Sequence, residues 1–362
     1  MKNKILLLVL SLVLITGLVI TGCAAPEAPA PAPAPAPTPE APPKMELRMN
    51  GVHPPGTLWT QFVLDEIADM IGQAIPRATI TTYPGSTVIP YAQSYTAVQD
   101  GVVDWTLVYG GHNTGVFPIH EIALQPMLFS NIAVTNMAIN ELSLKYPDFH
   151  DELSNPAVEW VGSSTLLKNH LHTNKPITTL ADLKGLRLGV IEESMANVAQ
   201  RLGAVATVMP AGDLYTPVER GIVDGLIAPW GLVNVFKLYE VTNYHTTLYV
   251  GGGTAMHAFF NQDKWGEFTP EEQRSLKAML IPKLQEAMHR AASLSQEQVL
   301  RENIFADPDQ HMLTMSPQDL DKMSELLRPM WDEWANQMED EGHPGRSILE
   351  DAQTWATAFT LG

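Results

Sequence analysis

The sequence has very little that could build a covalent or metal-centred framework. Cys23 is the only cysteine among 362 residues, so neither a disulfide framework nor a thiolate metal site is possible. It also lacks the glycine-rich loops that hold phosphates or dinucleotides, and the G-x-S-x-G turn that presents a nucleophilic serine. Positive charge is scarce: 22 lysines and arginines stand against 40 aspartates and glutamates, for a net charge of −18. This balance argues against nucleic acid as a partner.

The histidines do not complete a metal or catalytic motif. "HEIAL" begins at His120 like a zinc-protease helix, but Leu124 stands where the second histidine is required. His170 and His172 in "HLH" would share one face of a strand and supply half of a metal site, yet no third ligand is in register. We therefore expect no metal site, no cofactor, no catalytic residue and no enzyme activity.

The first residues predict export followed by a stalk. Lys2 and Lys4 precede a long apolar run, which ends in "LVITGC" and so resembles a bacterial lipobox at Cys23. A retained membrane-spanning anchor is the alternative, because the run is about as long as the shortest spanning helices. We expect residues 1–22 to be a lipoprotein signal peptide and Cys23 to be lipidated. Residues 23–43 alternate alanine and proline and are expected to form an extended, semi-rigid stalk.

The remaining residues are too many for a single core, so two domains are expected. Strand and helix patterns alternate, which predicts parallel sheets covered by helices. The phrases "TAVQDGVVDWTLVYG" at 96–110 and "TPVERGIVDGLIAPW" at 216–230 are similar, and in each a helix ends at a glycine, Gly101 or Gly221, before a strand. The repeat predicts two α/β lobes of related layout, with each copy beside a cleft.

Beyond Thr269, longer helical periodicity predicts helices that pack across both lobes as a brace. We expect lobe I to contain residues 44–168 and 255–294. Lobe II is expected to contain residues 169–254 and 295–362.

Three segments carry a family resemblance: "KPITTLADLKGLRLGV", "DLYTPVERGIVDG" and "KLYEVTNYH". Together they resemble the solute-binding proteins of TRAP (tripartite ATP-independent periplasmic) transporters, over residues 45–330. The resemblance implies a two-lobed periplasmic-binding-protein-like fold, with a ligand cleft between the lobes and long C-terminal helices spanning them. It also implies delivery of a small-molecule solute to integral membrane permease subunits. The ligand in this family is usually an organic acid, clamped by an arginine after "DLKGL".

The sequence departs from that pattern. Gly189 stands where the family places its arginine. A second arginine that some members carry would fall near Asn169, and an asparagine of the family pattern is replaced by Ala228. Arg187 lies two residues before Gly189, so both would share a strand face, and Arg187 could reach the ligand across the space left by the glycine. The alternative is that Arg187 is an ordinary surface residue at a strand end.

Other candidates follow from their positions at predicted strand ends and loops facing the cleft. The aromatic candidates are Trp59, Trp105, Tyr109 and Trp230. The polar candidates are His53, Asn113, Asn234, Glu192 and Glu193. The two glutamates favour a cationic or polyhydroxylated ligand if they face the cleft, whereas solvated loop glutamates would have no such role.

The sequence therefore predicts an extracytoplasmic, lipid-anchored protein that captures a small molecule, an organic acid on the resemblance. An aromatic or uncharged solute bound without the arginine clamp is one alternative. A ligand-sensing lobe for a membrane receptor is another, and a secreted enzyme that has adopted the two-lobed fold is a third.

Overall fold

The structure is a computed structural model, which describes residues 42–113, 115–165, 168–250 and 255–361. The expected signal peptide, the lipidation site Cys23 and all but the end of the stalk lie outside the described residues. In the part of the chain that is described, no helix combines the length and the apolar character needed to cross a membrane.

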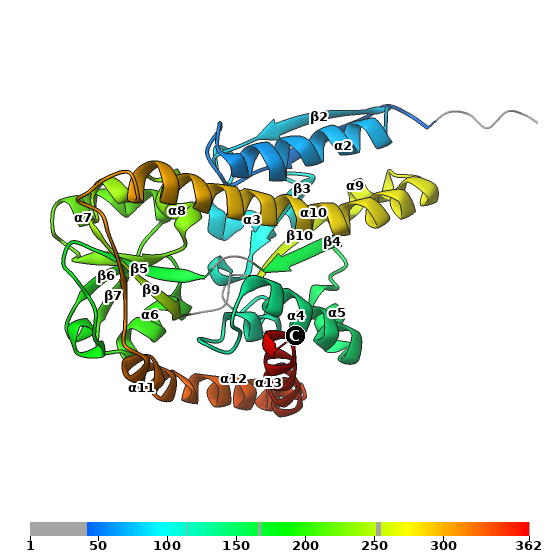
Figure 1. Ribbon diagram of the computed structural model, residues 1–362. Coiled ribbons are helices and arrows are strands. Elements are labelled where there is room, and N and C mark those ends of the chain that lie inside the picture. Colours follow the sequence, from blue (N-terminus) through cyan, green and yellow to red (C-terminus); the bar gives the residue numbers. More distant parts are fainter. Residues whose placement is uncertain (1–41, 114, 166–167, 251–254, 362) are drawn as a thin grey trace, which may run out of the picture. The chain divides into compact units, whose positions relative to one another are not determined.

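Lobe I is built on a five-stranded sheet with helices on both faces (Figure 1). Its strands, in spatial order, are β2 (Ala78–Tyr83), β1 (Met45–Asn50), β3 (Trp105–Tyr109), β10 (Ala255–Asn261) and β4 (Val158–Thr165). Its helices are α2 (Glu66–Ala74), α3 (Ser94–Gln99), α4 (Ile132–Lys145), α5 (Asp148–Leu153) and α9 (Gln262–Gly266). β1 pairs in parallel with β2 and β3, whereas β10 runs antiparallel to both of its neighbours. The first three strands along the chain are therefore parallel to one another, as predicted.

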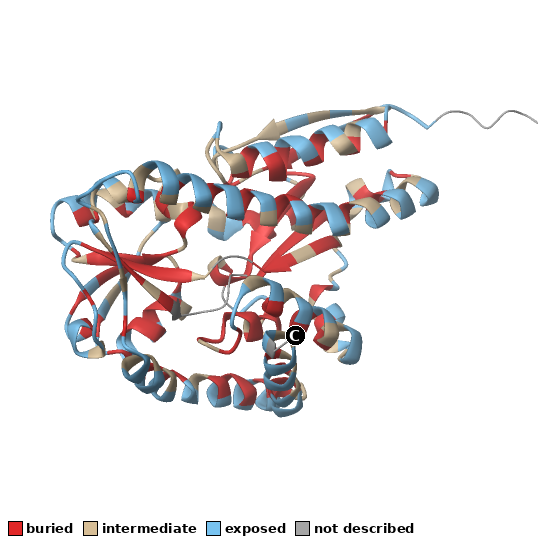
Figure 2. Cartoon of the chain, viewed as in Figure 1, coloured by how far each residue is buried: buried red, intermediate tan, exposed pale blue. Residues whose placement is uncertain are grey.

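Lobe II is built on a six-stranded sheet. Its strands, in spatial order, are β11 (His311–Thr314), β9 (Tyr244–Val250), β5 (Asn169–Thr173), β8 (Gly225–Ala228), β6 (Arg187–Val190) and β7 (Val205–Val208). Its helices are α6 (Glu193–Arg201), α7 (Tyr215–Glu219), α8 (Trp230–Val235) and α11 (Pro317–Leu327). One face packs on α6 and α11, and the other on α7 and α8. Figure 2 shows the central strands of both sheets as buried, whereas the edge strands β2, β7 and β11 carry half-buried or exposed residues.

The long helix α10 (Pro270–Val299) joins the two lobes. Its first turns pack on lobe I through Leu276, Leu280 and Leu284, and its last residue, Val299, belongs to the core of lobe II. Thr269 and Glu272 cap its start reciprocally, as the sequence suggests. The predicted brace across both lobes is therefore confirmed (Figure 1).

The last helices depart from the expected lobe boundaries. The pattern "SPQDLDKMSELLRPMWDEWANQM" predicts one long helix, but Pro329 interrupts it, because proline cannot donate the backbone hydrogen bond that a continuous helix needs. The chain then continues as α12 (Pro329–Asp340) and α13 (Gly345–Leu361), which share a core with α4 of lobe I. Trp331 and Trp334 donate from their indole nitrogens to backbone carbonyls of lobe I. This C-terminal segment therefore packs on lobe I, and not on lobe II as expected.

The repeated phrase forms the same set of arginine contacts once in each lobe. We call this set, an arginine bound to the glycine that ends the helix and to the aspartate that follows, the arginine lock. Gly101 and Gly221 end the two helices with φ of 67° and 66°, a conformation that glycine adopts without strain. In lobe I, Arg48 of β1 donates to the carbonyl oxygen of Gly101 at 2.7 Å and to both carboxylate oxygens of Asp104 at 2.8 and 3.1 Å. The two parts of the repeat are thus tied to the neighbouring strand.

Lobe II repeats the same contacts. Arg187 of β6 donates to the carbonyl oxygen of Gly221 at 2.9 Å and to Asp224 at 3.0 and 3.1 Å. Both locks stand at the amino ends of the strands that follow the repeated helix, β3 and β8. The step from helix to strand in each copy therefore lies away from the cleft. Each copy meets the cleft only near its last residues, Tyr109 and Pro229, because the strand carries the chain to the opposite end of the sheet.

Candidate functional site

A cavity of about 660 Å³ lies between the lobes, at the carboxyl ends of the parallel strands of both sheets. Lobe I supplies the segments that follow β1, β2 and β3, and lobe II supplies those that follow β6, β7 and β8. Loops at this edge converge because parallel strands all end on the same side. The sheet topology thus creates a concave site from segments that are distant in sequence.

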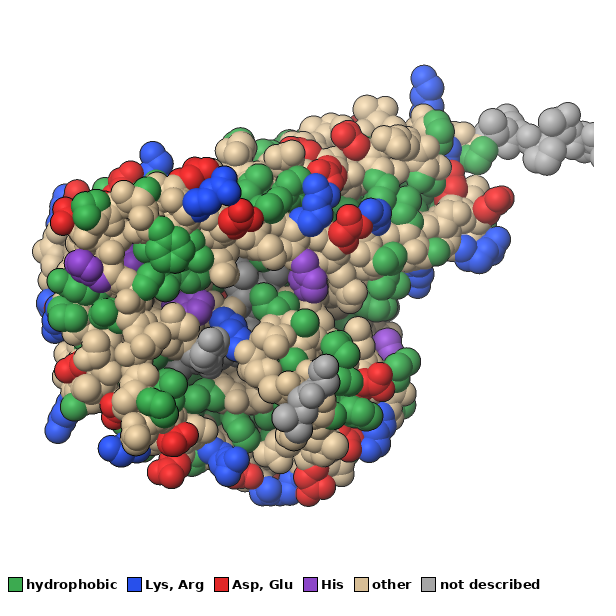
Figure 3. Space-filling model, in the orientation of Figure 1, with side chains coloured by type: hydrophobic (Ala, Val, Ile, Leu, Met, Phe, Trp, Pro, Cys, Tyr) green, Lys and Arg blue, Asp and Glu red, His purple; other side chains and the backbone are tan. Residues whose placement is uncertain are grey.

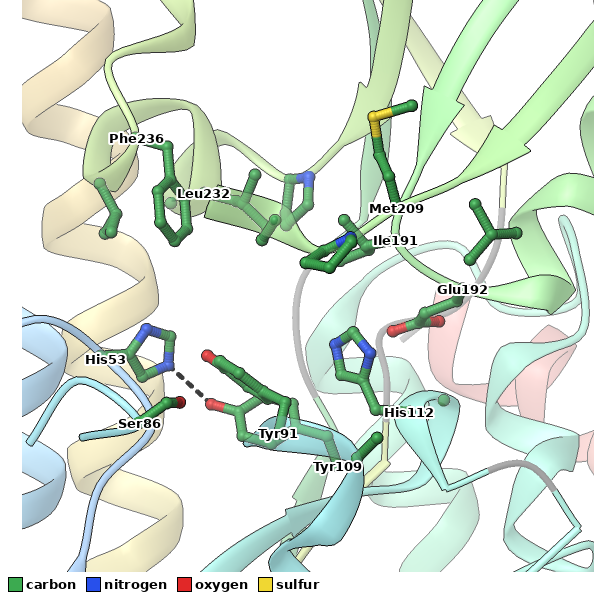
Figure 4. Close-up of a pocket in the computed structure, with 18 of the residues that line it drawn as sticks. His53, Ser86, Tyr91, Tyr109, His112, Ile191, Glu192, Met209, Leu232 and Phe236 are labelled. Carbon is green, nitrogen blue, oxygen red and sulfur yellow. Dashed lines mark hydrogen bonds between the residues drawn. The ribbon is translucent and has the colours of Figure 1, made fainter. Parts of the chain in front are cut away.

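The lobe I wall is a cluster of aromatic rings. The His53 ring stacks on Trp59, with centroids 4.7 Å apart, and its Nε2 lies 2.7 Å from the Tyr109 hydroxyl oxygen. Tyr91 packs against Tyr109 and His112, with ring centroids 5.3 and 5.1 Å away. Figure 4 shows the rings of His53, Tyr91, Tyr109 and His112 together on one side of the cavity. They offer a ligand both flat apolar faces and hydrogen-bonding tips.

Burial keeps this wall neutral. It lowers the pKa of the His53 imidazole to about 3, because a charged ring would lose its hydration. It raises the pKa of the Tyr91 and Tyr109 phenols for the same reason. Burial also lowers the pKa of His112, an effect that the nearby Glu192 carboxylate opposes. Near neutral pH the lobe I wall therefore carries no positive charge.

The lobe II wall is largely apolar. Its apolar lining residues are Ile191, Val208, Met209, Leu232, Val235 and Phe236, together with prolines and alanine. In Figure 4 Ile191, Leu232 and Phe236 lie across the cavity from the aromatic cluster, whereas the Met209 side chain points away from it. Such a combination of apolar lining and few polar groups is typical of sites for small organic molecules.

Glu192 is a charged group of lobe II that reaches across the cavity to Gly111 of lobe I. It directly precedes α6, is 4% exposed, and accepts a hydrogen bond from the Ser194 hydroxyl at 3.3 Å. Its carboxylate packs so closely on Gly111 that a Cβ there would lie 2.3 Å from the Glu192 Cδ. Figure 4 shows the same carboxylate pointing toward His112. Glycine at position 111 is therefore what admits the glutamate.

Several predicted site residues line this cavity: His53, Trp59, Tyr109, Asn169, Glu192 and Glu193. Asn113 lies just behind the wall, where its side-chain amide donates to the Tyr109 carbonyl oxygen at 2.9 Å and so holds the turn. The position of these residues fits a role in binding.

Five other candidates, Gly189 among them, do not line it. Trp105 is fully buried in the core of lobe I, at the amino end of the strand whose carboxyl end carries Tyr109. Trp230 is 3% exposed and packs against His172 and His245 in the interior of lobe II. The Asn234 amide donates instead to Gln298 of α10.

Arg187 is the fourth. It lies at the amino end of β6, whereas Ile191 and Glu192 line the cavity beyond the carboxyl end of that strand. Its guanidinium is already bound by Asp224, which raises the pKa of the arginine and lowers that of the aspartate. The surface alternative for Arg187 therefore fits the structure, and the relocated clamp does not.

Gly189 stands where the family places its arginine, and apolar side chains of other segments fill the space beside it. A Cβ at Gly189 would lie 2.7 Å from a Leu214 methyl carbon and 3.6 Å from the Met209 sulfur. Gly189 does not itself line the cavity, but Met209 does. Apolar side chains thus pack where a longer residue at position 189 would enter the site.

Sequence reasoning missed several lining residues, including Ser86, Tyr91, His112, Met209 and Phe236. Met209 directly follows β7 and His112 lies three residues after β3, so their place after the carboxyl ends of these strands was a usable signal. Phe236 and Leu232 lie on a different face of the same helical segment from Trp230 and Asn234, and only packing decides which face meets the cavity.

The histidine motifs have structural partners. Nδ1 of His172 lies 2.8 Å from Nδ1 of His245, and its Nε2 lies 3.1 Å from the Ala228 carbonyl oxygen. Nδ1 of His120 lies 2.5 Å from a carboxylate oxygen of Glu152. Over the described ranges, no three histidine, cysteine, aspartate or glutamate side chains are grouped so that they could hold a metal ion.

Residues 49–337 match the family model described as bacterial extracellular solute-binding protein, family 7. The chain belongs to this family. The resemblance to TRAP solute-binding proteins is thereby confirmed, and with it the two-lobed fold. Family 7 is a family of transport proteins and not of enzymes, and its members act in the periplasm or outside the cell.

Two characterised relatives are similar over part of their length. The ectoine/5-hydroxyectoine-binding periplasmic protein UehA of Ruegeria pomeroyi is 24% identical over 205 residues, covering 54% of this chain and 58% of that one. The 2,3-diketo-L-gulonate-binding periplasmic protein YiaO of Escherichia coli is 23% identical over 201 residues, covering 54% and 59%. The chain spans about half the length of the curated relatives it matches, between 31% and 59%.

Solved structures match over nearly their whole length. A TRAP periplasmic solute-binding protein from Bordetella bronchiseptica, with bound mandelate, has a TM-score of 0.75 at 21% identity, covering 87% of this chain and 99% of that chain. One from Desulfovibrio salexigens, with bound orotic acid, has a TM-score of 0.72 at 20% identity, covering 86% and 99%. At this identity the likeness establishes the fold.

Proposed function

We propose that this protein captures a small organic solute in the cavity between its lobes and delivers it to the integral membrane subunits of a TRAP-type transporter. The observation that supports the proposal is the cavity itself, whose walls come from both lobes of a family 7 fold. Closure of the lobes around a solute would bury it, and release would follow reopening. No chemical step is needed, and we propose no enzymatic activity.

We propose an organic acid as the solute, because proteins that this chain resembles bind gulonate derivatives, mandelate or orotate. A second candidate, an aromatic or uncharged solute, is favoured by a specific observation. Position 189 is a glycine, and Arg187 is bound by Asp224 away from the cavity. Without that clamp, recognition would rest on the rings of the lobe I wall.

Thermal unfolding of the purified protein against a metabolite panel tests the function. A solute at about 100 times its dissociation constant adds about 2.7 kcal/mol to the free energy of unfolding and raises the melting temperature by several degrees. The same solute should lose affinity in Tyr109→Leu, which removes a cavity ring, and keep it in Tyr215→Leu, an aromatic residue of lobe II outside the lining. A panel of acids, sugars, amines and zwitterions that produces no shift would count against a solute-binding role.

We also propose that a lipid on Cys23 tethers the protein to the membrane through the alanine- and proline-rich stalk. The sequence "LVITGC" supports this. In cells fed a labelled fatty acid, the wild-type chain should carry the label and sediment with membranes. Cys23→Ser should lose the label and leave the membrane fraction, whereas unchanged sedimentation would favour a retained membrane-spanning anchor.

A further inference from the structure

The cavity has an unusual charge balance for a site that receives organic acids. Among the described residues that line it, two are glutamates, Glu192 and Glu193, and none is lysine or arginine. Glu192 is buried, so water screens its charge poorly. A purely anionic solute would bring a further negative charge toward this carboxylate without gaining a cationic partner from the lining.

Lys168 is the nearby cation, since it directly precedes Asn169, a lining residue. Burial lowers its pKa to about 8, and its charge lowers the pKa of His170. Lys168 is not part of the cavity lining. It therefore does not replace the missing clamp in the way that an arginine at position 189 would.

Aromatic rings stand beside the buried carboxylate. Figure 4 shows the Glu192 carboxylate directed toward His112, and the His112 ring lies 5.1 Å from that of Tyr91 and 6.1 Å from that of Tyr109. Tyr91 and Tyr109 meet at a tilt of 67°, so their rings form two sides of a corner. Ring faces attract cations, and a carboxylate beside them supplies the opposite charge.

We infer that the solute carries a cationic nitrogen, an ammonium or amidinium group, which pairs with Glu192 and lies against the rings of Tyr91, Tyr109 and His112. This inference rests on the proposed function and specifies the chemical class of its solute. An organic acid fits the site when it also carries such a nitrogen and is therefore a zwitterion. The apolar lobe II wall, with Leu232, Met209 and Phe236, then receives the carbon frame.

Matched compounds separate charge from shape. Binding to the full chain is measured by calorimetry for three carbon frames, benzyl, cyclohexylmethyl and butyl, each as the ammonium, the alcohol and the carboxylate, with 4-(aminomethyl)benzoate as a zwitterion. The ammonium of at least one frame, or the zwitterion, should bind at least tenfold more tightly than the matched alcohol and carboxylate. A carboxylate that binds more tightly than its matched ammonium overturns the inference.

Two glutamate variants locate the charge. Glu192→Gln keeps the size of the side chain and should weaken binding of the cation at least tenfold. Glu219→Gln removes an equal charge from an exposed residue of lobe II that lies outside the lining and should change the affinity less than threefold. Equal affinities in wild type and Glu192→Gln overturn the inference. Tyr91→Leu should also weaken binding, whereas Tyr91→Phe, which keeps the ring, should not.

Failure of the inference and failure of the function give different results. A carboxylate solute whose affinity is lost in Lys168→Met and kept in Glu192→Gln would overturn the cationic class while supporting solute binding. If no compound of any charge, in these series or in the metabolite panel, binds the folded protein, the proposed function falls and the inference falls with it.

Discussion

Mild acid should destabilise this protein strongly, because its interior holds neutral histidines. Burial lowers the pKa of His53 to about 3 and that of His170 to about 4, and it holds the pKa of His172 and His257 well below the usual value. In the folded protein these rings stay neutral at pH 5.5. In the unfolded chain they bind protons with a pKa near 6.5. Their contribution to stability is thus present above pH 6.5 and is lost as the pH falls below it.

The size of the effect follows from proton linkage. At pH 5.5 each such histidine favours the unfolded chain by about 1.4 kcal/mol, and at pH 7.5 by less than about 0.1 kcal/mol. Four of them together remove about 5 kcal/mol, which is comparable with the whole stability of many domains. Glu121 offsets part of this loss, because burial raises the pKa of its carboxyl group and so has the opposite sign.

Urea unfolding at pH 7.5 and 5.5, followed by circular dichroism, measures the difference. The free energy of unfolding should fall by several kcal/mol, with a pH slope that corresponds to about three to four protons taken up on unfolding near pH 5.5. His257→Gln removes one of these groups and should reduce the difference by about 1.4 kcal/mol. A free energy of unfolding that changes by less than about 1 kcal/mol between the two pH values would refute the argument that these rings are buried and neutral.

The remaining predictions concern the two arginine locks and the contact across the cleft. Arg48→Ala leaves the Asp104 carboxylate, which is 3% exposed, without its guanidinium partner and should cost about 2–3 kcal/mol in urea unfolding, whereas Arg187→Ala, with a more exposed partner, should cost less. If the Arg187 variant is the less stable of the two, burial does not decide the strength of the locks. Because Arg187 lies away from the cavity, its alanine variant should bind the solute within twofold of wild type by calorimetry; a larger loss would restore it as a clamp. Gly111→Ala should displace the Glu192 carboxylate, since the new Cβ would stand 2.3 Å from it, and should weaken solute binding about tenfold, a loss worth about 1.4 kcal/mol. Unchanged affinity would mean that this close approach is not part of the bound state.

The family, the order of strands and helices and the two related lobes could be predicted from the sequence. These features depend on local signals: apolar periodicity, glycine at a helix end, the capping pair Thr269 and Glu272, and phrases repeated at a fixed spacing. Each of these signals acts over a few residues, so it survives without knowledge of the rest of the chain.

Which residues face the cavity was decided by tertiary structure. Trp105 and Tyr109 share a face of β3, yet only Tyr109 stands at the end that meets the cleft. On α8, packing against α10 turns Asn234 toward Gln298. The two-residue period of a strand places Arg187 and Gly189 on one face, but it does not reveal Asp224, which directly precedes the neighbouring strand β8.

The sequence by itself thus determined a two-lobed protein of the solute-binding kind, because its local patterns specify the elements and their order. The composition of the binding site was decided only when separate segments of both lobes met at the sheet edges. Pairing register and helix packing fix the end, the face and the partner of each side chain, and none of these is a local property of the chain.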